Sequence, residues 1–458
     1  MTPRPPMARR RSRPGAAPGR RTPGRLVLAL GLATALVLPV AGTAQGADGS
    51  PGAATSGILR SGAARSDSPG RSTAAAHWTA TWTASPTAAN SSGLSHNGLT
   101  DQTIRDIVRT SVGGSAVRVR LSNRYGTRPV TFDKVTVGLA DGSSATGVTP
   151  VTFGGATSVT VPVGADVTGD PTALTVGSGQ ALAVSLFSSA ATGPATYHNA
   201  AHTTSYLATG DHAADGAPGL AFAGTTTSWL FVDGVDVLAA PGVGTIVALG
   251  DSITDGTGTA LDSNTRWTDD LYARIAAAPA GHLAAVANAG IGGNEVTADR
   301  QPPLYGVSAQ HRLDADVLRQ PGVSLALVFE GINDLTAGDV PADQVIAGLR
   351  DIVDRVHAAG LKAVGFTITP CGGYSVCGSG PLAQRALVNT WIRTSGVYDS
   401  VVDADAVVRD PADPDRLLAA YDSGDHLHPN AAAYRQLATA IDLDTLARLA
   451  AHGRTPHA

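Results

Sequence analysis

The stretch VALGDSITDGTG, residues 247–258, decides the fold of the C-terminal half of the chain. Its apolar residues 247–249 indicate a buried strand that stops at Gly250, and Asp251 and Ser252 follow at once in a turn rich in Gly, Thr and Asp. Two interpretations are open at this point. The two polar residues cap the next helix, or Ser252 is a nucleophile held at the end of a sheet.

From residue 243 onward, apolar stretches alternate with stretches of helical spacing. Strands are expected at 244–250, 283–290, 323–331, 361–370 and 400–405, and helices at 266–278, 341–360, 382–396 and 430–451. Such alternation is typical of a parallel sheet with helices on both faces. Ligands of these sheets bind outside the carboxyl ends of the strands. We therefore expect an α/β domain over residues 243–452 with its site at that edge.

The preceding residues, 77–240, have a different rhythm. Apolar and polar residues alternate with period two in several short runs, and Gly, Pro, Asn and Asp separate them, at 116–123, 130–140, 157–163 and 180–189. Many short strands with turn signals between them are typical of a β-sandwich. We expect a β-sandwich domain of jelly-roll type over 77–240.

The N-terminus has the composition of an export signal. Residues 4–25 contain eight Arg and no acidic residue, and the apolar stretch 26–42 ends near small residues. These features predict a secretory signal peptide over 1–47. The alternative is a membrane anchor, but 17 residues with a Pro near the end are marginal for a span. Because the signal peptide would be cleaved, we expect a secreted protein without a membrane span. Residues 48–76 are rich in Gly, Ala, Ser and Pro, which predicts a disordered linker.

Charge and cysteine content narrow the function further. The 458 residues suffice for two domains, and a formal net charge of −4 provides no basic field for a nucleic acid. The two cysteines, Cys371 and Cys377, lie in CGGYSVC, and export would place them in an oxidising compartment. We predict that they form a disulfide, because a metal site would need more ligands nearby.

Polar residues follow the expected strands at several points, and together they could supply a hydrolytic serine site. Ser252 would be the nucleophile and His428 the general base, with Asp425 accepting the other N–H of the imidazole. His426 is a rival base, but the directly adjacent Asp425 is poorly placed to bond its ring. The alternative for DHLHPN, residues 425–430, is a polar loop before a helix.

An oxyanion would also need hydrogen-bond donors. The backbone N–H groups of Ser252 and Gly293 and the side-chain amide of Asn333 could donate to it. Taken singly, NAGIGGN at 288–294 could be a flexible turn and GIND at 331–334 an Asx-turn. Candidates for the nucleophile, the base and the oxyanion donors nevertheless occur together, at four strand or helix boundaries of one α/β domain. Such a combination is improbable by chance.

Residues 245–445 resemble the GDSL, or SGNH, hydrolase family. The family has four sequence blocks, and each has a counterpart here. The first block corresponds to Gly250-Asp251-Ser252 with Gly256, and the second to NAGIGGN. The third corresponds to GIND and the last to Asp425-x-x-His428. The resemblance implies a flavodoxin-like three-layer α/β/α domain and makes Ser252, Gly293, Asn333 and His428 the four namesake residues, with Asp425 completing a triad. It favours Gly293 over Gly292. Stretches 78–86 and 108–127 resemble the β-domain that precedes the catalytic domain in secreted actinobacterial members.

The resemblance implies a secreted serine ester hydrolase that works through an acyl-enzyme. It requires no metal and no organic cofactor. We expect a monomer whose substrate is a small-molecule or polysaccharide ester, with acetyl or other short acyl groups on carbohydrate favoured by export and by the small share of aromatic residues, 5%. The alternatives are a lipase or lysophospholipase, and a non-catalytic carbohydrate-binding protein with Trp78, Trp82 and Trp229 as candidate platforms.

Overall fold

The computed structural model describes residues 76–278, 284–301 and 303–452, which belong to one compact unit, Arg71–Ala458. The expected signal peptide, 1–47, and all but the last residue of the expected linker, 48–76, lie outside the described residues. Secretion therefore stays a prediction from the sequence.

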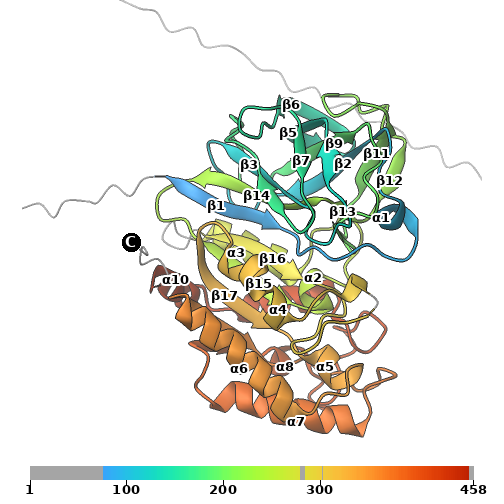
Figure 1. Ribbon diagram of the computed structural model, residues 1–458. Helices are drawn as coiled ribbons and strands as arrows, with labels where there is room; N and C mark the ends of the chain where they lie inside the picture. Colours follow the sequence, from blue (N-terminus) through green and yellow to red (C-terminus); the bar gives the residue numbers. More distant parts are fainter. Residues whose placement is uncertain (1–75, 279–283, 302, 453–458) are drawn as a thin grey trace, which may run out of the picture. The chain divides into compact units, whose positions relative to one another are not determined.

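The N-terminal region contains two larger antiparallel sheets and two small strand pairs (Figure 1). The six-stranded sheet has the order β12 (Gly224–Thr226), β11 (Ser205–Thr209), β2 (Gln102–Arg109), β9 (Ala181–Ser188), β5 (Lys134–Asp141), β6 (Ser144–Pro150). The four-stranded sheet has the order β1 (His77–Thr83), β14 (Val232–Ala239), β3 (Val117–Ser122), β8 (Asp166–Thr168). The pairs are β10 (Tyr197–His198) with β13 (Trp229–Leu230), and β4 (Val130–Phe132) with β7 (Val159–Val161).

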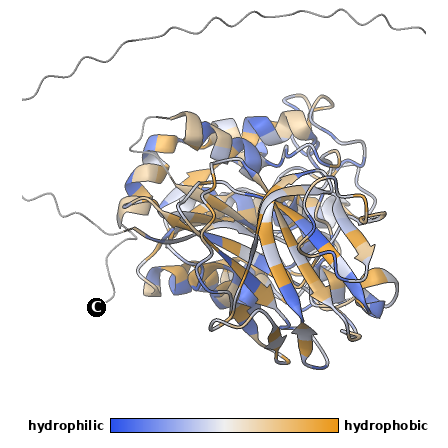
Figure 2. Cartoon of the chain, turned by 90° about the horizontal axis from the view of Figure 1, so that it is seen from above, coloured by the Kyte–Doolittle hydropathy of each residue, from blue (hydrophilic) through white to orange (hydrophobic). Residues whose placement is uncertain are grey.

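Both larger sheets contribute to one hydrophobic core, which gives the region its sandwich character. Ile104 and Leu186 from one sheet and Val119 and Val235 from the other belong to the same buried cluster. Alternation along the strands produces this arrangement, since successive side chains point to opposite faces. Figure 2 shows hydrophobic and hydrophilic residues alternating along several strands. A short helix, α1 (Gly93–Asn97), also lies in this region.

One expected strand is divided in two. We predicted a single strand over 130–140, but β4 ends at Phe132 and β5 begins at Lys134, and the two strands belong to different sheets. The carboxylate of Asp133, between them, accepts hydrogen bonds from the backbone N–H and the hydroxyl of Ser189 at 2.7 and 2.8 Å. This local bonding competes with a continuous ladder, and the alternation of residues does not reveal it.

The C-terminal region contains a five-stranded, wholly parallel sheet. Its order is β16 (Ala285–Gly290), β15 (Thr245–Gly250), β17 (Val323–Phe329), β18 (Lys362–Phe366), β19 (Ser400–Val402). Numbered along the chain this is the order 2-1-3-4-5 of flavodoxin-like sheets, whose ligand crevice lies where the order reverses, beside the first and third strands. The predicted fold class is confirmed.

Helices cover both faces of this sheet because its strands are apolar on both sides. Val247 and Leu249 pack against one group of helices, Ile246 and Ala248 against the other. The first group comprises α4 (Ala309–Leu313), α6 (Ala342–Ala358) and α7 (Ser379–Thr394), of which α6 and α7 lie side by side in Figure 1. The second comprises α3 (Trp267–Ala277), α9 (Ala431–Ala440) and α10 (Leu443–His452).

Several shorter elements complete the region. They are the single turns α2 (Ser252–Asp255), α5 (Ile332–Thr336) and α8 (Ala404–Val408), a 3₁₀ turn over Pro303–Tyr305, and a π-helical turn over Asp314–Leu318 that continues α4. The expected closing helix, 430–451, is in fact two helices. Ile441 is extended, and the Asp442 carboxylate accepts from the Thr445 N–H at 2.6 Å, which caps a new helix and ends the continuous one.

Hydrogen bonds join the β-region to the parallel sheet. The Thr83 hydroxyl of β1 donates to the carbonyl oxygen of Asn288 in β16 at 2.8 Å, and the Val286 N–H donates to the Ser111 hydroxyl at 3.0 Å.

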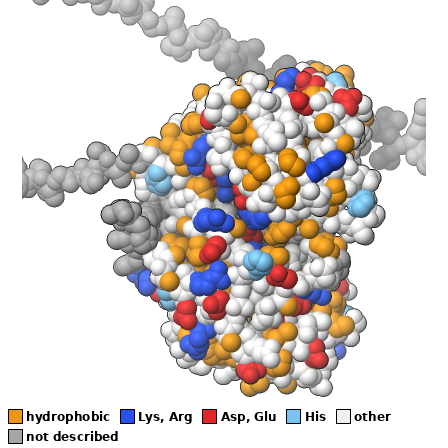
Figure 3. Space-filling model, in the orientation of Figure 1, with side chains coloured by type: hydrophobic (Ala, Val, Ile, Leu, Met, Phe, Trp, Pro, Cys, Tyr) orange, Lys and Arg blue, Asp and Glu red, His pale blue; other side chains and the backbone are white. Residues whose placement is uncertain are grey.

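On the face shown in Figure 3, Lys and Arg side chains lie among Asp and Glu side chains. In the described part of the chain, no helix combines the length and the apolarity needed to cross a bilayer.

Candidate active site

Ser252 stands at a sharp turn between strand β15 and helix α2. A Cβ on Gly250 would lie 2.1 Å from Oγ1 of Thr254 and 2.8 Å from the carbonyl oxygen of Phe329, so only glycine allows the chain to turn this closely. The Asp251 carboxylate accepts from the Ile253 N–H at 2.8 Å and caps the helix. Asp251 therefore braces the turn, and Ser252 is the first helical residue, with its side chain at the end of the strand.

The structure brings Ser252, His428 and Asp425 together in one hydrogen-bonded series. Oγ of Ser252 lies 2.8 Å from Nε2 of His428, and Nδ1 of His428 lies 2.6 Å from Oδ2 of Asp425. Ser252 is 7% exposed and the His428 side chain 14% exposed, so the series is shielded but not sealed. A hydroxyl, an imidazole and a carboxylate in this order can pass the hydroxyl proton to the ring and stabilise the imidazolium.

Asp425 is held as a carboxylate by the loop itself. Its Oδ1 accepts from the backbone N–H groups of Leu427 and His428 at 3.0 and 2.8 Å. Partial burial acts to raise its pKa, but the bonds from the His428 ring and from these two N–H groups outweigh burial and bring the pKa of Asp425 down to about 2. The side chain is thus ionised at neutral pH, as an acceptor for the imidazole N–H requires.

The rival base His426 takes no part in this series. Its Nδ1 lies 2.6 Å from Oδ2 of Asp422, and its side chain is 51% exposed. His426 also has a left-handed backbone, φ 67°. The loop thus forms two separate histidine–aspartate pairs, and only His428 reaches Ser252.

Gly293 lies in the turn that follows β16, with a positive φ of 78° that favours glycine. A Cβ here would lie 2.3 Å from Cδ1 of Tyr305, so the ring occupies the space that a side chain would need. Among the described residues, the N–H groups of Gly293 and Ser252 have no intramolecular acceptor, and both can donate to a bound molecule. Gly292 has neither the positive φ nor the ring contact.

Asn333 comes from the start of α5, after β17. Its Nδ2 donates to the carbonyl oxygen of Asn294 at 2.9 Å, which uses one of the two N–H bonds of the amide and leaves the other. The neighbouring Asp334 accepts from the N–H groups of Val296 and Thr297 at 2.8 and 3.1 Å. The turn that holds Gly293 and the helix that holds Asn333 are therefore bonded to each other.

Residues 248–436 match the model of the GDSL-like Lipase/Acylhydrolase family. The C-terminal region of this chain belongs to that family. The matched range contains every residue of the hydrogen-bonded series and both turns that carry the candidate donors. Membership makes this protein a carboxylic ester hydrolase.

Solved structures with a similar arrangement include two esterases. A carbohydrate acetylesterase from Sinorhizobium meliloti is 15% identical, with a TM-score of 0.36, over 45% of this chain and 99% of that chain. An aryl esterase from M. smegmatis is 16% identical, also with a TM-score of 0.36, over 45% of this chain and 100% of that chain. No curated protein matches the chain.

One residue of this GDSL-like hydrolase that sequence reasoning missed is Arg312, in α4. Its side chain is 1% exposed and donates to the carbonyl oxygens of Gly250 and Ala289 at 2.9 and 2.6 Å and to Oδ1 of Asn294 at 2.9 Å. It also contacts Glu330 at 3.3 Å. One guanidinium thus joins the ends of β15, β16 and β17, which lead to Ser252, Gly293 and Asn333.

Acidic side chains surround this guanidinium beneath the serine turn. Burial raises the pKa of Asp251 to about 7 and the pKa of Glu330 well above its usual range, and the charge of Arg312 only partly opposes both shifts. Burial also raises the pKa of Asp334 despite its bonds to Val296 and Thr297. No signal in the sequence brings these residues together, because they come from separate strand ends and one helix.

The predicted disulfide is confirmed. Cys371 and Cys377 are joined, with their Cα atoms 5.8 Å apart. The closed loop lies beside the histidine loop, since a Cβ on Gly373 would lie 3.2 Å from Cγ of His426.

Within the described ranges, the structure has no group of three or more His, Cys, Asp or Glu side chains suited to a metal ion.

Proposed function

We propose that this hydrolase is an exported serine esterase that removes acetyl or other short acyl groups from carbohydrate through an acyl-enzyme. The observation that carries the catalytic part is the series from Ser252 through His428 to Asp425, with distances of 2.8 and 2.6 Å. Export rests on the basic and apolar pattern of residues 1–47.

In the acylation step, Oγ of Ser252 attacks the ester carbonyl carbon while Nε2 of His428 takes the hydroxyl proton. Asp425 accepts the N–H at Nδ1, fixes the tautomer and stabilises the imidazolium. His428 then gives the proton to the leaving alcohol oxygen as the carbon–oxygen bond of the ester breaks. Water repeats the sequence on the acyl-enzyme and releases the free acid.

Negative charge on the carbonyl oxygen develops beside three donors. They are the backbone N–H groups of Ser252 and Gly293 and the remaining amide N–H of Asn333. The bond from Asn333 to Asn294 and the bonds of Arg312 to Gly250 and Asn294 hold these donors in place before substrate arrives. Donors fixed in advance stabilise the transition state without reorganisation during the reaction.

A short acyl group on carbohydrate suits the surface better than a lipid does. The large hydrophobic side chains that are exposed in the described part of the chain are few, and each lies on a different segment, at Val163, Leu220, Leu261, Val376 and Leu387. Enzymes that work at lipid interfaces need a contiguous apolar surface. Scattered single residues do not provide one.

The experiment measures hydrolysis of p-nitrophenyl esters from acetate to palmitate, and release of acetate from acetylated xylan, by the wild type and by Ser252→Ala. We expect the highest kcat/KM for acetate, release of acetate from the polymer, and loss of nearly all activity in the folded variant. A preference for long acyl chains would indicate that the substrate is a lipid ester and not a carbohydrate ester. Equal activity of the variant and the wild type would show that Ser252 is not the nucleophile.

A further inference from the structure

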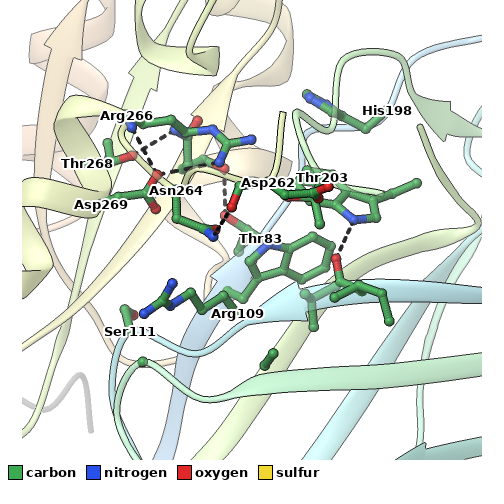
Figure 4. Close-up of a pocket in the computed structure, with 18 of the residues that line it drawn as sticks. Thr83, Arg109, Ser111, His198, Thr203, Asp262, Asn264, Arg266, Thr268 and Asp269 are labelled. Atoms are coloured by element: carbon green, nitrogen blue, oxygen red, sulfur yellow. Dashed lines mark hydrogen bonds and ion pairs between the residues drawn. The ribbon is translucent and has the colours of Figure 1, made fainter. Parts of the chain in front are cut away.

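A cavity lies away from the serine series, between the β-region and the parallel-sheet region. Its volume is about 490 Å³, within the roughly 300–1,000 Å³ of ligand pockets. One side is formed by residues of β1, β2, β9 and β11, and the other by the loop after α2, the start of α3 and strand β16. In Figure 4, Arg109 lies below Asp262 and Asn264.

This cavity is separate from the ester-cleaving centre. None of Ser252, Gly293, Asn333 and His428 is among its lining residues. Its nearest link to that centre is Asp255, the last residue of the helix that begins at Ser252. The carboxylate of Asp255 faces His198 of the β-region at 3.0 Å.

The walls are held in place by bonds that leave other polar groups available. Arg266 donates to the carbonyl oxygens of Asp255 and Ala201 at 2.7 and 2.5 Å, and its backbone N–H donates to Oδ2 of Asp269 at 3.0 Å. Asp262 accepts from the N–H and the hydroxyl of Thr204 at 2.7 Å each. A site stabilised in this way is formed before a ligand arrives, which lowers the cost of binding.

The polar groups of the cavity that remain without a partner include both hydrogen-bond donors and hydrogen-bond acceptors. Within the described residues, the Arg109 guanidinium has no hydrogen-bonding partner; it lies over the ring of Tyr272 at 6.0 Å. The hydroxyl of Tyr206 and the side-chain oxygen of Asn264 also line the cavity, and neither has a hydrogen-bonding partner among those residues. The indoles of Trp82 and Trp229, 4.9 Å apart, supply an aromatic wall.

This lining excludes other chemical classes of ligand. The three carboxylates of Asp255, Asp262 and Asp269 outnumber the two guanidinium groups of Arg109 and Arg266, so the lining has no excess of positive charge to hold a phosphate or a carboxylate. An acyl chain could not satisfy the buried polar groups around it. The described residues of the cavity also form no group of three acidic or histidine ligands suited to a cation. A neutral molecule with many hydroxyls matches both donors and acceptors, and its apolar C–H faces can lie against aromatic rings.

We propose that this cavity is a binding site for a neutral carbohydrate of one or two sugar units, separate from the catalytic centre. Such a site would hold the enzyme on a polysaccharide while Ser252 acts on an ester elsewhere. The inference does not depend on the ester chemistry, since binding can be measured without turnover.

The test uses the full chain carrying Ser252→Ala and measures binding of cellobiose, xylobiose and chitobiose by calorimetry. In this background, Arg109→Ala removes the uncommitted guanidinium and Tyr206→Phe removes one hydroxyl. Arg319→Ala is the matched control, because Arg319 is an exposed arginine outside the cavity. We expect saturable binding of at least one disaccharide, weakened about tenfold or more by Arg109→Ala and several-fold by Tyr206→Phe, with Arg319→Ala unchanged.

Three results would overturn the proposal. They are no saturable binding of any of the three disaccharides at millimolar concentration by the folded protein, binding that both cavity variants leave unchanged, and binding of inorganic phosphate or decanoate in place of the sugars. Tyr206→Phe keeps the test decisive if Arg109→Ala does not fold. Because Ser252→Ala is inactive by design, failure of the proposed ester hydrolysis would leave this result unaffected.

Discussion

Arg312 provides the sharpest test of how the strand ends are held. In Arg312→Met the side chain keeps its aliphatic part but loses donors to the Gly250 and Ala289 carbonyls and to Asn294. Gly250 retains a bond from the Ile291 N–H at 3.0 Å, so part of the loss is offset. Removing one partner of a buried charged network costs about 3–5 kcal/mol. We expect this loss in the free energy of unfolding, a large share of the roughly 5–15 kcal/mol of a typical domain.

The assay is urea denaturation at neutral pH, combined with kinetics on p-nitrophenyl acetate. Because the turns that carry Ser252 and Gly293 lose a common anchor, kcat should fall about 10–100-fold with a smaller change in KM. Arg319→Met, an exposed arginine seven residues further on, is the control and should change neither quantity. A loss below about 1 kcal/mol with unchanged kcat would refute the role given to Arg312.

Further predictions concern the donors, the acids and the disulfide. Asn333→Ala should lower kcat on p-nitrophenyl acetate about 10²–10³-fold, as loss of one oxyanion donor does, with KM nearly unchanged. Asp425→Asn should lower kcat about 10²–10⁴-fold at pH 7, and a fall of less than tenfold would mean that the carboxylate is dispensable. Since the folded pKa of Asp251 is raised to about 7, its contribution to wild-type stability should decline as pH rises from about 4 to about 7. In urea titrations at several pH values, Asp251→Asn should make the decline shallower than in the wild type without abolishing it, because burial also raises the pKa of Glu330 and of Asp334. Replacing Cys371 and Cys377 by Ser should lower the free energy of unfolding by about 2 kcal/mol, measured by the same denaturation.

The sequence predicted the parallel sheet and the residues at its edge because both depend on local patterns. Apolar runs such as 244–250 end in polar residues, and parallel strands bring their carboxyl ends to one edge. The structure accordingly places Oγ of Ser252 and Nε2 of His428, 176 residues apart, within 2.8 Å. Their catalytic roles stay a proposal until the kinetics are measured.

Features that depend on tertiary contacts could not be predicted. Arg312 has no periodic or motif signal, and its function follows only from the packing of α4 beneath three strand ends. The division of 130–140 at Asp133 and of 430–451 at Asp442 arises from side-chain hydrogen bonds that compete with the regular ladder or helix. The pair between His198 and Asp255 joins two regions with different sequence rhythms.

In the proposed mechanism, Ser252 forms the acyl-enzyme. The most direct measurement is the intact mass of the protein, followed by peptide mapping, after treatment with a fluorophosphonate, with turnover of p-nitrophenyl acetate followed in parallel. We expect one adduct, on Ser252, with activity lost in proportion to labelling, and no adduct in Ser252→Ala. Labelling should be normal in Ser379→Ala, which changes an exposed serine at the start of α7. Full labelling of Ser252→Ala, or wild-type activity that survives complete labelling of Ser252, would contradict this mechanism.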